Sequence, residues 1–195
     1  MSEAVVKASV ADESRLNNIV GVLVALSATF MAVCNVKDGN VVQAMSQAQS
    51  SAVDSWAFYQ AKSTKQALAE SVLEQLAVQR DTAPGLTPEG RTLIERKTAE
   101  LAARVKRYDS EKAEIKKQAE GLQRRYDELN VHDDQFDMAE ALLSISVAVF
   151  GITALTRKRW LLAFGLVFAG AGYLLGLAGF LGWTIHPEFL ARLLG

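Results

Sequence analysis

Apolar residues are concentrated in three runs, each long enough to form a helix across a lipid bilayer. The first, residues 16–36, has no charge between Arg15 and Lys37. The second covers residues 136–156, and the third, residues 160–186, is free of charge throughout. Because about 20 apolar helical residues cross a hydrocarbon core of roughly 30 Å, the pattern predicts three transmembrane helices at these positions.

A cleaved secretory signal is the alternative interpretation of the first run, because weakly basic residues precede an apolar core of nearly signal length. Residues 31–34 imitate a lipoprotein cleavage site, but Val33 is larger than the small residue expected before Cys34. We therefore expect a retained anchor with Cys34 as a buried thiol. As the only cysteine, Cys34 excludes an intrachain disulfide and a CxxC motif.

The polar residues 37–135 predict an extramembrane helical hairpin between the first two spans. Asp38, Gly39 and Asn40 indicate a turn or hinge at the membrane surface. Residues 41–79 contain neither Gly nor Pro, so a long helix is expected there. One side of its first half suits close contact with another helix, because it carries the small residues Ala44, Ala48, Ser51, Ala52 and Ser55.

The hairpin turn is predicted at residues 81–90, where Pro84 and Gly85 interrupt the helical pattern. Thr87 is suited to cap the next helix ahead of a proline at its first position. That helix is expected over residues 88–130.

This second helix carries apolar residues in unbroken heptads, which is typical of a coiled coil. The residues spaced by seven are Ile94, Leu101, Tyr108, Ile115, Leu122 and Leu129. A second series, offset by four, is Thr98, Val105, Lys112, Ala119 and Tyr126. Since the preceding helix is the nearest partner, the sequence predicts a long antiparallel coiled-coil hairpin, with exposed i,i+4 ion pairs that keep it soluble.

The remaining segments complete an all-α integral membrane protein. Residues 1–15 are short and polar and are expected to form a disordered tail, while residues 187–195 suit a short interfacial helix. Arg157, Lys158 and Arg159 form a basic loop, and short basic loops stay in the cytoplasm. We therefore expect a multi-pass protein of a bacterial inner (plasma) membrane with a periplasmic hairpin and a cytoplasmic amino terminus; the alternative orientation places the hairpin in the cytoplasm.

Small residues follow one face of the third predicted span. They are Gly165, Ala169, Gly172, Gly176 and Gly179, spaced by four, three, four and three. Such faces let helix backbones approach closely in lipid. The stripe therefore predicts a packing face, with a partner helix either in the same chain or in another copy.

Residues 56–66, WAFYQAKSTKQ, place aromatic and basic side chains together between the first span and the charged helix. The pattern leaves two interpretations: a candidate docking patch of Trp56, Tyr59, Lys62 and Lys65, or core residues of the hairpin with solvated lysines at its edge. With the flanking spans, the stretch resembles an uncharacterised bacterial membrane-protein family of unknown function, the DUF4337 type. The resemblance implies the architecture over nearly the whole chain and brings no activity, cofactor or catalytic residue with it.

Charge and polar chemistry limit the function classes. The formal net charge is −1, which gives no reason to expect a nucleic-acid partner. His132 and the neighbouring acids match no metal-ligand spacing, so neither a metal nor another cofactor is expected. Glu140 lies about one turn inside the second span and is a candidate for ion handling.

Two function classes follow from these patterns. The first is a non-enzymatic membrane scaffold that contacts lipid and self-associates through its spans and its hairpin, with another membrane or periplasmic protein as a further partner. The alternative is a pore-forming or accessory subunit of an ion or small-solute channel or transporter. In that case the pore would be lined by Asn17, Ser144, Ser146 or Thr153, with Glu140 at its mouth. An enzyme is not expected, because no catalytic set of residues is present.

Overall fold

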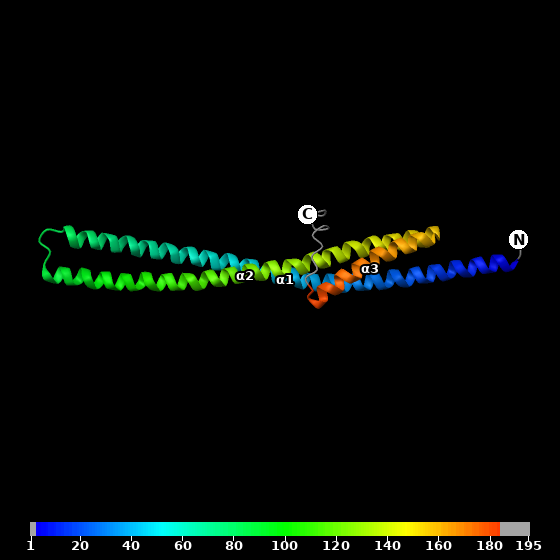
Figure 1. Cartoon of the computed structure of the whole chain (residues 1–195), viewed down its shortest axis with the longest axis horizontal. Helices are drawn as coiled ribbons and strands as arrows, with labels where there is room; N and C mark the ends of the chain where they lie inside the picture. Colours follow the sequence, from blue (N-terminus) through cyan, green and yellow to red (C-terminus); the bar gives the residue numbers. More distant parts are fainter. Residues whose placement is uncertain (1–2, 184–195) are drawn as a thin grey trace. The chain divides into compact units, whose positions relative to one another are not determined.

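The computed structural model describes residues 3–183, with side chains from residue 14, and is all-helical over that range. The described residues form three helices, α1 (Glu3–Thr82), α2 (Pro88–Thr156) and α3 (Arg159–Leu181) (Figure 1). The chain divides into two units. We call residues up to 45 together with residues from 127 onward the three-helix unit, and residues 46–126 the helix-pair unit.

Helix α1 is longer than the sequence pattern predicts. It begins at Glu3, so residues 3–15, which we expected as a disordered tail, are helical. The expected turn at Asp38, Gly39 and Asn40 is also absent, because these residues lie within α1. A glycine inside a helix costs only about 1 kcal/mol. Elongation of an existing helix, in contrast, adds one hydrogen bond for each residue fixed, so the apolar run carries the helix through both segments.

Helix α2 likewise runs without a break from the hairpin turn through the second apolar run. The sequence pattern treated residues 88–130 and 136–156 as separate helices. No Gly or Pro occurs between Gly121 and Gly151, so nothing ends the helix at the boundary.

The turn between α1 and α2 has a defined chemistry. Gly85 has a φ angle of 77°, in the left-handed region that glycine adopts without strain. The backbone N–H of Gly90 donates a hydrogen bond of 3.1 Å to Oγ1 of Thr87, which is therefore the N-cap of α2. These contacts fix the point where the chain reverses.

Helix α3 ends earlier than the predicted span. Gly182 adopts a left-handed conformation with φ 70°, and the backbone N–H of Trp183 donates to the carbonyl of Ala178 at 2.9 Å. This is a glycine C-cap, which closes the helix after Leu181. The last residues of the predicted span, 184–186, and the predicted interfacial tail, 187–195, lie outside the described residues.

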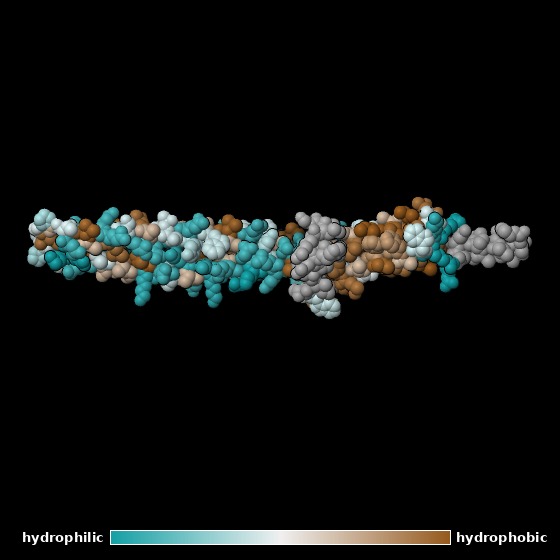
Figure 2. Space-filling model, turned by 45° about the horizontal axis from the view of Figure 1, so that its top comes forward, coloured by the Kyte–Doolittle hydropathy of each residue, from teal (hydrophilic) through white to brown (hydrophobic). Residues whose placement is uncertain are grey.

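All three helices are long and apolar enough to cross a membrane. In the three-helix unit, large apolar side chains remain on the surface, including Val36 at 70%, Leu155 at 85% and Leu174 at 70% exposure. The space-filling view shows apolar residues gathered on the three-helix unit and mostly hydrophilic residues on the helix-pair unit (Figure 2).

The three-helix unit has an interior built from all three helices. Val20, Phe150 and Ala169 form a buried cluster. Aromatic rings extend the interior, with Phe30 4.9 Å from Tyr173, and Phe136 5.2 Å from Phe180, between ring centroids. Offset and edge-to-face rings at such distances add attraction beyond their buried area.

Candidate functional site

The small-residue stripe of α3 is used for packing within the chain. Gly165, Ala169, Gly172, Gly176 and Gly179 are all buried. A methyl group at Gly172 would lie 2.8 Å from Cγ of Leu143 and 3.1 Å from the carbonyl oxygen of Ala139.

The other glycines of the stripe receive aromatic rings. A methyl group at Gly165 would lie 2.6 Å from the ring of Phe150, and one at Gly179 would lie 2.8 Å from the ring of Phe136. At Gly176 the nearest groups belong to α1, the ring of Phe30 at 2.7 Å and Sγ of Cys34 at 3.1 Å. Of the two arrangements that the sequence left open, the intramolecular one is present, and any contact between copies must use another surface.

Polar side chains from α1 and α2 meet at one end of the apolar segments. We call this group the polar collar; its members are Asn35, Asp38, His132, Asp133, Gln135, Asp137 and Glu140. Nδ2 of Asn35 donates to Oε2 of Glu140 at 3.4 Å, which links α1 to α2. The buried amide of Gln135 donates to the carbonyl oxygen of Trp183 at 2.7 Å. Gln135 therefore holds the chain just after α3 against α2.

Carboxylates gather within the polar collar. Burial raises the pKa of Asp38 to about 6, and the charge of Asp133, a hydrogen bond with it, and the charges of Asp137 and Glu140 add to the shift. Among the side chains that the structure describes, no group of three His, Cys, Asp or Glu residues could hold a metal ion. The collar is therefore a place where like charges are held together, and its geometry gives no cation cage.

The residues proposed for a pore divide between the surface and the interior of one chain. Ser146 and Thr153 are fully buried. The hydroxyl of Thr153 donates to the carbonyl of Val149 at 2.8 Å. Ser144 is exposed and contacts Sδ of Met31 at 3.9 Å, and Asn17 is exposed. A pore between copies would thus need residues other than Ser146 and Thr153 on its wall.

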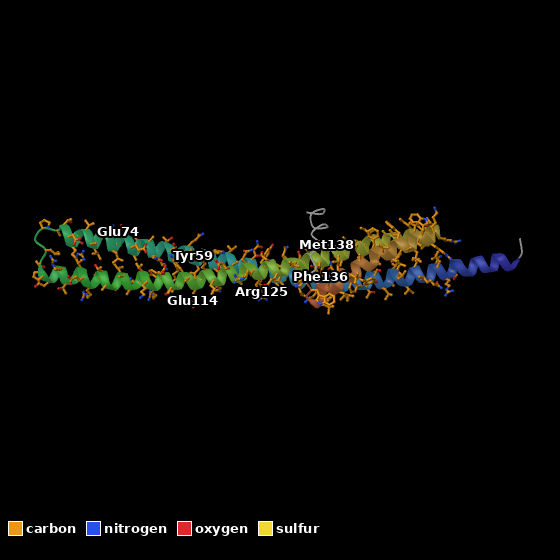
Figure 3. The ribbon with its side chains drawn as sticks, viewed as in Figure 1. Tyr59, Glu74, Glu114, Arg125, Phe136 and Met138 are labelled. Atoms are coloured by element: carbon orange, nitrogen blue, oxygen red, sulfur yellow. The ribbon has the colours of Figure 1, made fainter. Side chains whose placement is uncertain are left out.

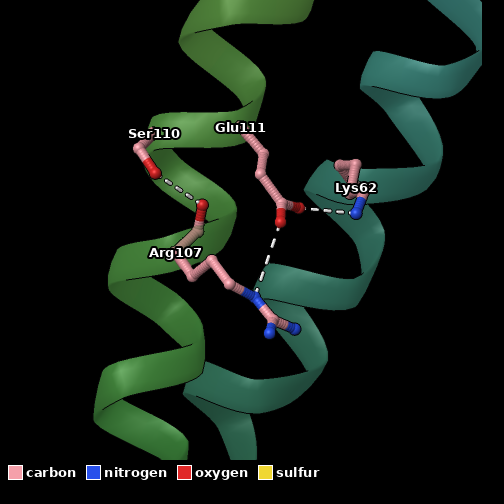
Figure 4. A network of polar contacts seen from close by, with 4 residues as sticks. All are labelled: Lys62, Arg107, Ser110 and Glu111. Carbon is pink, nitrogen blue, oxygen red and sulfur yellow. Dashed lines mark hydrogen bonds and ion pairs between the residues drawn. The ribbon is translucent and has the colours of Figure 1, made fainter.

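In the helix-pair unit, the predicted docking patch contributes to contacts between α1 and α2. Nζ of Lys62 lies 2.5 Å from Oε2 of Glu111, whose other oxygen lies 3.5 Å from Nε of Arg107 (Figure 4). The Lys62 ammonium also lies 5.3 Å from the ring centroid of Phe58 and 5.4 Å from that of Tyr108. Its side chain is only 18% exposed, so Lys62 is a cation held inside the pair.

Of the other patch residues, Trp56 and Tyr59 make ring contacts within the helix pair, whereas Lys65 does not. The rings of Trp56 and Tyr59 pack edge to face with centroids 5.7 Å apart, and Nζ of Lys112 on α2 lies 5.6 Å from the Tyr59 ring. Tyr59 and Glu114 mark the two helices of this unit in Figure 3. Lys65 is exposed. These contacts favour core residues of the hairpin over an open docking patch.

The heptad residues of α2 in its helix-pair segment are all buried or half-buried, as are Gly90, Glu111 and Gly121. Ile94, Ile115 and Ala119 are buried, and the half-buried members are Thr98, Leu101, Val105, Tyr108, Lys112, Leu122 and Tyr126. Leu129 is half-buried as well and belongs to the three-helix unit. With Lys62 opposite Glu111 and Tyr59 opposite Lys112, α1 and α2 run antiparallel in this unit.

The model of one protein family, described as a domain of unknown function (DUF4337), matches residues 16–182. The chain belongs to the DUF4337 family. No curated protein and no solved structure matches it. The DUF4337 match covers segments of both units, ends at the C-cap glycine of α3, and assigns no reaction to any of the residues above.

Sequence reasoning found only the first part of the partner seam on α1 of this DUF4337 chain, the small residues Ala48, Ala52 and Ser55. Buried or half-buried residues follow α1 at alternating spacings of four and three, namely Ala48, Ala52, Ser55, Tyr59, Lys62, Gln66, Ala69, Leu73 and Leu76. Their heptad spacing was visible in the sequence, but small and polar residues occupy most positions, so hydrophobicity alone did not reveal it. Asn35 and Gln135 were also missed, because single amides carry no motif.

Proposed function

We propose that this protein is a non-enzymatic scaffold of a bacterial inner membrane, anchored by three spans and able to self-associate. The observation that carries the proposal is the outward apolar surface of the three-helix unit. Moving apolar surface from water into lipid is favourable by a free energy of roughly 25 cal/mol for each Å² covered. Exposed apolar areas of this kind therefore mark membrane or protein contacts.

The helix-pair unit supports the scaffold part of the proposal. Its heptad seams and the Lys62–Glu111 pair fit an antiparallel coiled coil. Residues 46–82 would be about 55 Å long at 1.5 Å per residue. Polar side chains of both helices contribute to their pairing, as the contacts of Lys62 with Glu111 and of Lys112 with Tyr59 illustrate. A rigid rod of this kind is suited to spacing or joining proteins.

The proposed orientation rests on the basic loop between α2 and α3. Arg157 and Lys158 lie between two apolar helices, whereas Arg159, predicted as the last residue of the loop, is the first residue of α3; all three are exposed. A short loop rich in Lys and Arg stays in the cytoplasm. The hairpin would then face the periplasm, and a reporter inserted after Pro84 tests this assignment, since it should be active only as a periplasmic fusion.

Two measurements test the proposed function. Washing membranes with alkaline carbonate should leave the full-length protein in the lipid fraction, because three apolar helices hold it there. Light scattering in mild detergent should give a mass above that of one 21.2 kDa chain after correction for detergent. Release by carbonate would contradict the membrane anchor, and a monomer at all concentrations would contradict self-association.

A further inference from the structure

The side of α1 that faces away from α2 is unlike the exposed side of an ordinary soluble helix. We call Ala57, Ala61, Thr64, Leu68, Ser71 and Gln75 the outer stripe; it repeats at spacings of four and three and continues to Val78. All of these residues are exposed, Leu68 at 67% and Val78 at 61%. None of these residues carries a charge, and the stripe is bounded by the exposed Asp54, which precedes Ala57 at the same spacing. Helix α1 therefore has two heptad faces, of which α2 covers one.

The matching face of α2 provides an internal comparison. Its solvent-facing positions at the same spacing run from Arg96 to Arg124. Six of these nine positions are charged, namely Arg96, Glu100, Arg107, Glu114, Lys117 and Arg124. The two helices lie in the same unit and face the same solvent, so solubility does not explain why charges are much rarer on the outer side of α1 than on that of α2.

We propose that the outer stripe of α1 contacts the outer stripe of a second copy of this chain, parallel and in register. This inference rests on the proposed function, because copies anchored in one membrane with the same orientation present their α1 helices in the same direction. Around a two-fold axis between parallel helices, each residue meets its own copy. A charge at that position would face an identical charge, which is unfavourable. An uncharged stripe satisfies this condition, whereas the outer face of α2 does not.

The residue types in the stripe agree with a helix–helix contact. Ala57, Ala61 and Ser71 are small enough to let two helices approach, and Leu68 and Val78 supply apolar area. The same mixture of small and polar residues occupies the α1 seam that α2 covers, as Ala48, Ala52 and Ser55 illustrate. The outer stripe thus repeats a surface that already pairs with a helix in this unit.

The size of the stripe explains why the contact needs the membrane. Residues 57–78 extend about 33 Å and a helix is about 10 Å wide, so each copy offers about 330 Å². Stable interfaces bury about 800 Å² on each partner. Anchoring both copies in one bilayer raises their effective concentration and lets a small contact suffice. The test therefore uses the full-length chain in membranes.

Disulfide cross-linking in a Cys34→Ala background tests the contact. Ala57→Cys places a thiol on the outer stripe, and Ala103→Cys places one at an exposed alanine on the outer face of α2. On mild oxidation, Ala57→Cys should give disulfide-linked dimers at least about tenfold faster than Ala103→Cys, because a disulfide requires Cα atoms within about 7 Å. Equal rates, or no dimer from Ala57→Cys, would overturn the proposal.

Two further measurements separate the possible failures. Light scattering on the Cys34→Ala protein in mild detergent reports self-association by itself. An oligomer without an Ala57→Cys cross-link in membranes overturns the outer-stripe contact and leaves the scaffold proposal standing, whereas a monomer that also gives no Ala57→Cys cross-link in membranes overturns both. Ala61→Arg should abolish the Ala57→Cys cross-link, while Ala103→Arg should not. A cross-link that forms only between Ala57→Cys and Val78→Cys in mixed copies would indicate antiparallel helices and overturn the in-register arrangement.

Discussion

Two neighbouring glycines of α3 differ in what a single methyl group would meet. At Gly172 the added carbon would lie 2.8 Å from Leu143 and 3.1 Å from a backbone carbonyl oxygen, which cannot rotate away. At Gly170 nothing lies within 4 Å. The close approach of α3 to α2 thus depends on Gly172 and not on Gly170.

We predict that Gly172→Ala destabilises the three-helix unit by about 1–3 kcal/mol, the usual cost of overpacking a well-packed interior. Thermal unfolding in detergent, followed by circular dichroism, measures the effect. Gly170→Ala is the matched control and should leave the unfolding midpoint unchanged or slightly higher, because alanine is the better helix former. Equal losses in the two variants would contradict the packing described for Gly172.

Asp38 gives the polar collar a dependence on pH. Its folded pKa of about 6 lies above the ordinary value of 3.8, so folding favours the protonated form. The contribution of this group to stability is therefore fully present below pH 3.8 and is lost as the pH rises through about 6. Asp133, Asp137 and Glu140 face it from α2, and its own helix offers the exposed Lys37.

We predict that Asp38→Asn raises the unfolding midpoint at pH 8 and leaves it nearly unchanged at pH 4. The asparagine keeps the size of the side chain and removes the charge that the neighbouring carboxylates repel. In a chain of this size about 1 kcal/mol corresponds to about 2–4 °C. Asp54→Asn, at an exposed position of α1, is the control and should have no such effect. A gain of the same size at both pH values would show that charge is not the cause.

At the scale of the helix, the Lys62–Glu111 contact is the most enclosed ion pair described in the structure. Lys62 lies between the rings of Phe58 and Tyr108, where an ammonium is attracted to the ring faces. A hydrogen bond from Lys62 holds the pKa of Glu111 below its ordinary value of 4.5. The pair therefore stabilises the fold above pH 4.5, and its contribution is lost as the pH falls through the lower folded value.

We predict that Lys62→Met lowers the unfolding midpoint of the helix-pair unit at pH 7 and that the loss shrinks at pH 3. Lys97→Met is the matched control, because Lys97 makes an exposed pair with Glu100 at 3.1 Å and such pairs contribute little. Thermal unfolding of both variants at the two pH values gives the comparison. A Lys97→Met loss as large as that of Lys62→Met would argue against a special role of the enclosed pair.

The sequence predicted the helices better than their ends. The heptads of α2 and the apolar runs depend on residue type, which is printed in the chain, and the small-residue stripe of α3 marked a packing face for the same reason. The continuity of α1 through Gly39 depends on the flanking helix, whose elongation outweighs one glycine. The ring that packs against Gly176 belongs to Phe30, 146 positions earlier, and this contact depends on tertiary structure that no local pattern encodes.

The polar contacts were harder to predict for a different reason. Lys62 and Tyr59 have the composition of a docking patch, and only the antiparallel register shows that Glu111 and Lys112 lie opposite them. The sequence pattern predicts a turn at Asp38 because Gly39 and Asn40 follow it. Its importance comes from the carboxylates of α2, almost one hundred residues away in the chain.

At the scale of the whole molecule, charge and apolar surface are segregated between the two units. The three-helix unit carries apolar side chains outward, while the helix-pair unit carries the ion pairs of Lys97, Arg104 and Lys116 on its surface. This segregation fits a three-helix unit surrounded by lipid hydrocarbon and a helix-pair unit surrounded by water. If the apolar helices span a membrane as proposed, the short basic loop is the feature expected to set which side of it the helix pair occupies.

We predict that neutralising this loop, with Arg157→Gln, Lys158→Gln and Arg159→Gln together, weakens the orientation. The positive-inside bias is counted over short loops next to the spans, and long translocated segments contribute little. The activity of a periplasmic reporter inserted after Pro84 should therefore fall in the triple variant. Neutralising Arg104, Lys106 and Arg107 removes the same number of positive charges from the helix pair and should leave the reporter unchanged. Reporter activity that responds equally to both triple variants would mean that total charge decides the orientation, and the periplasmic assignment of the hairpin would lose its physical basis.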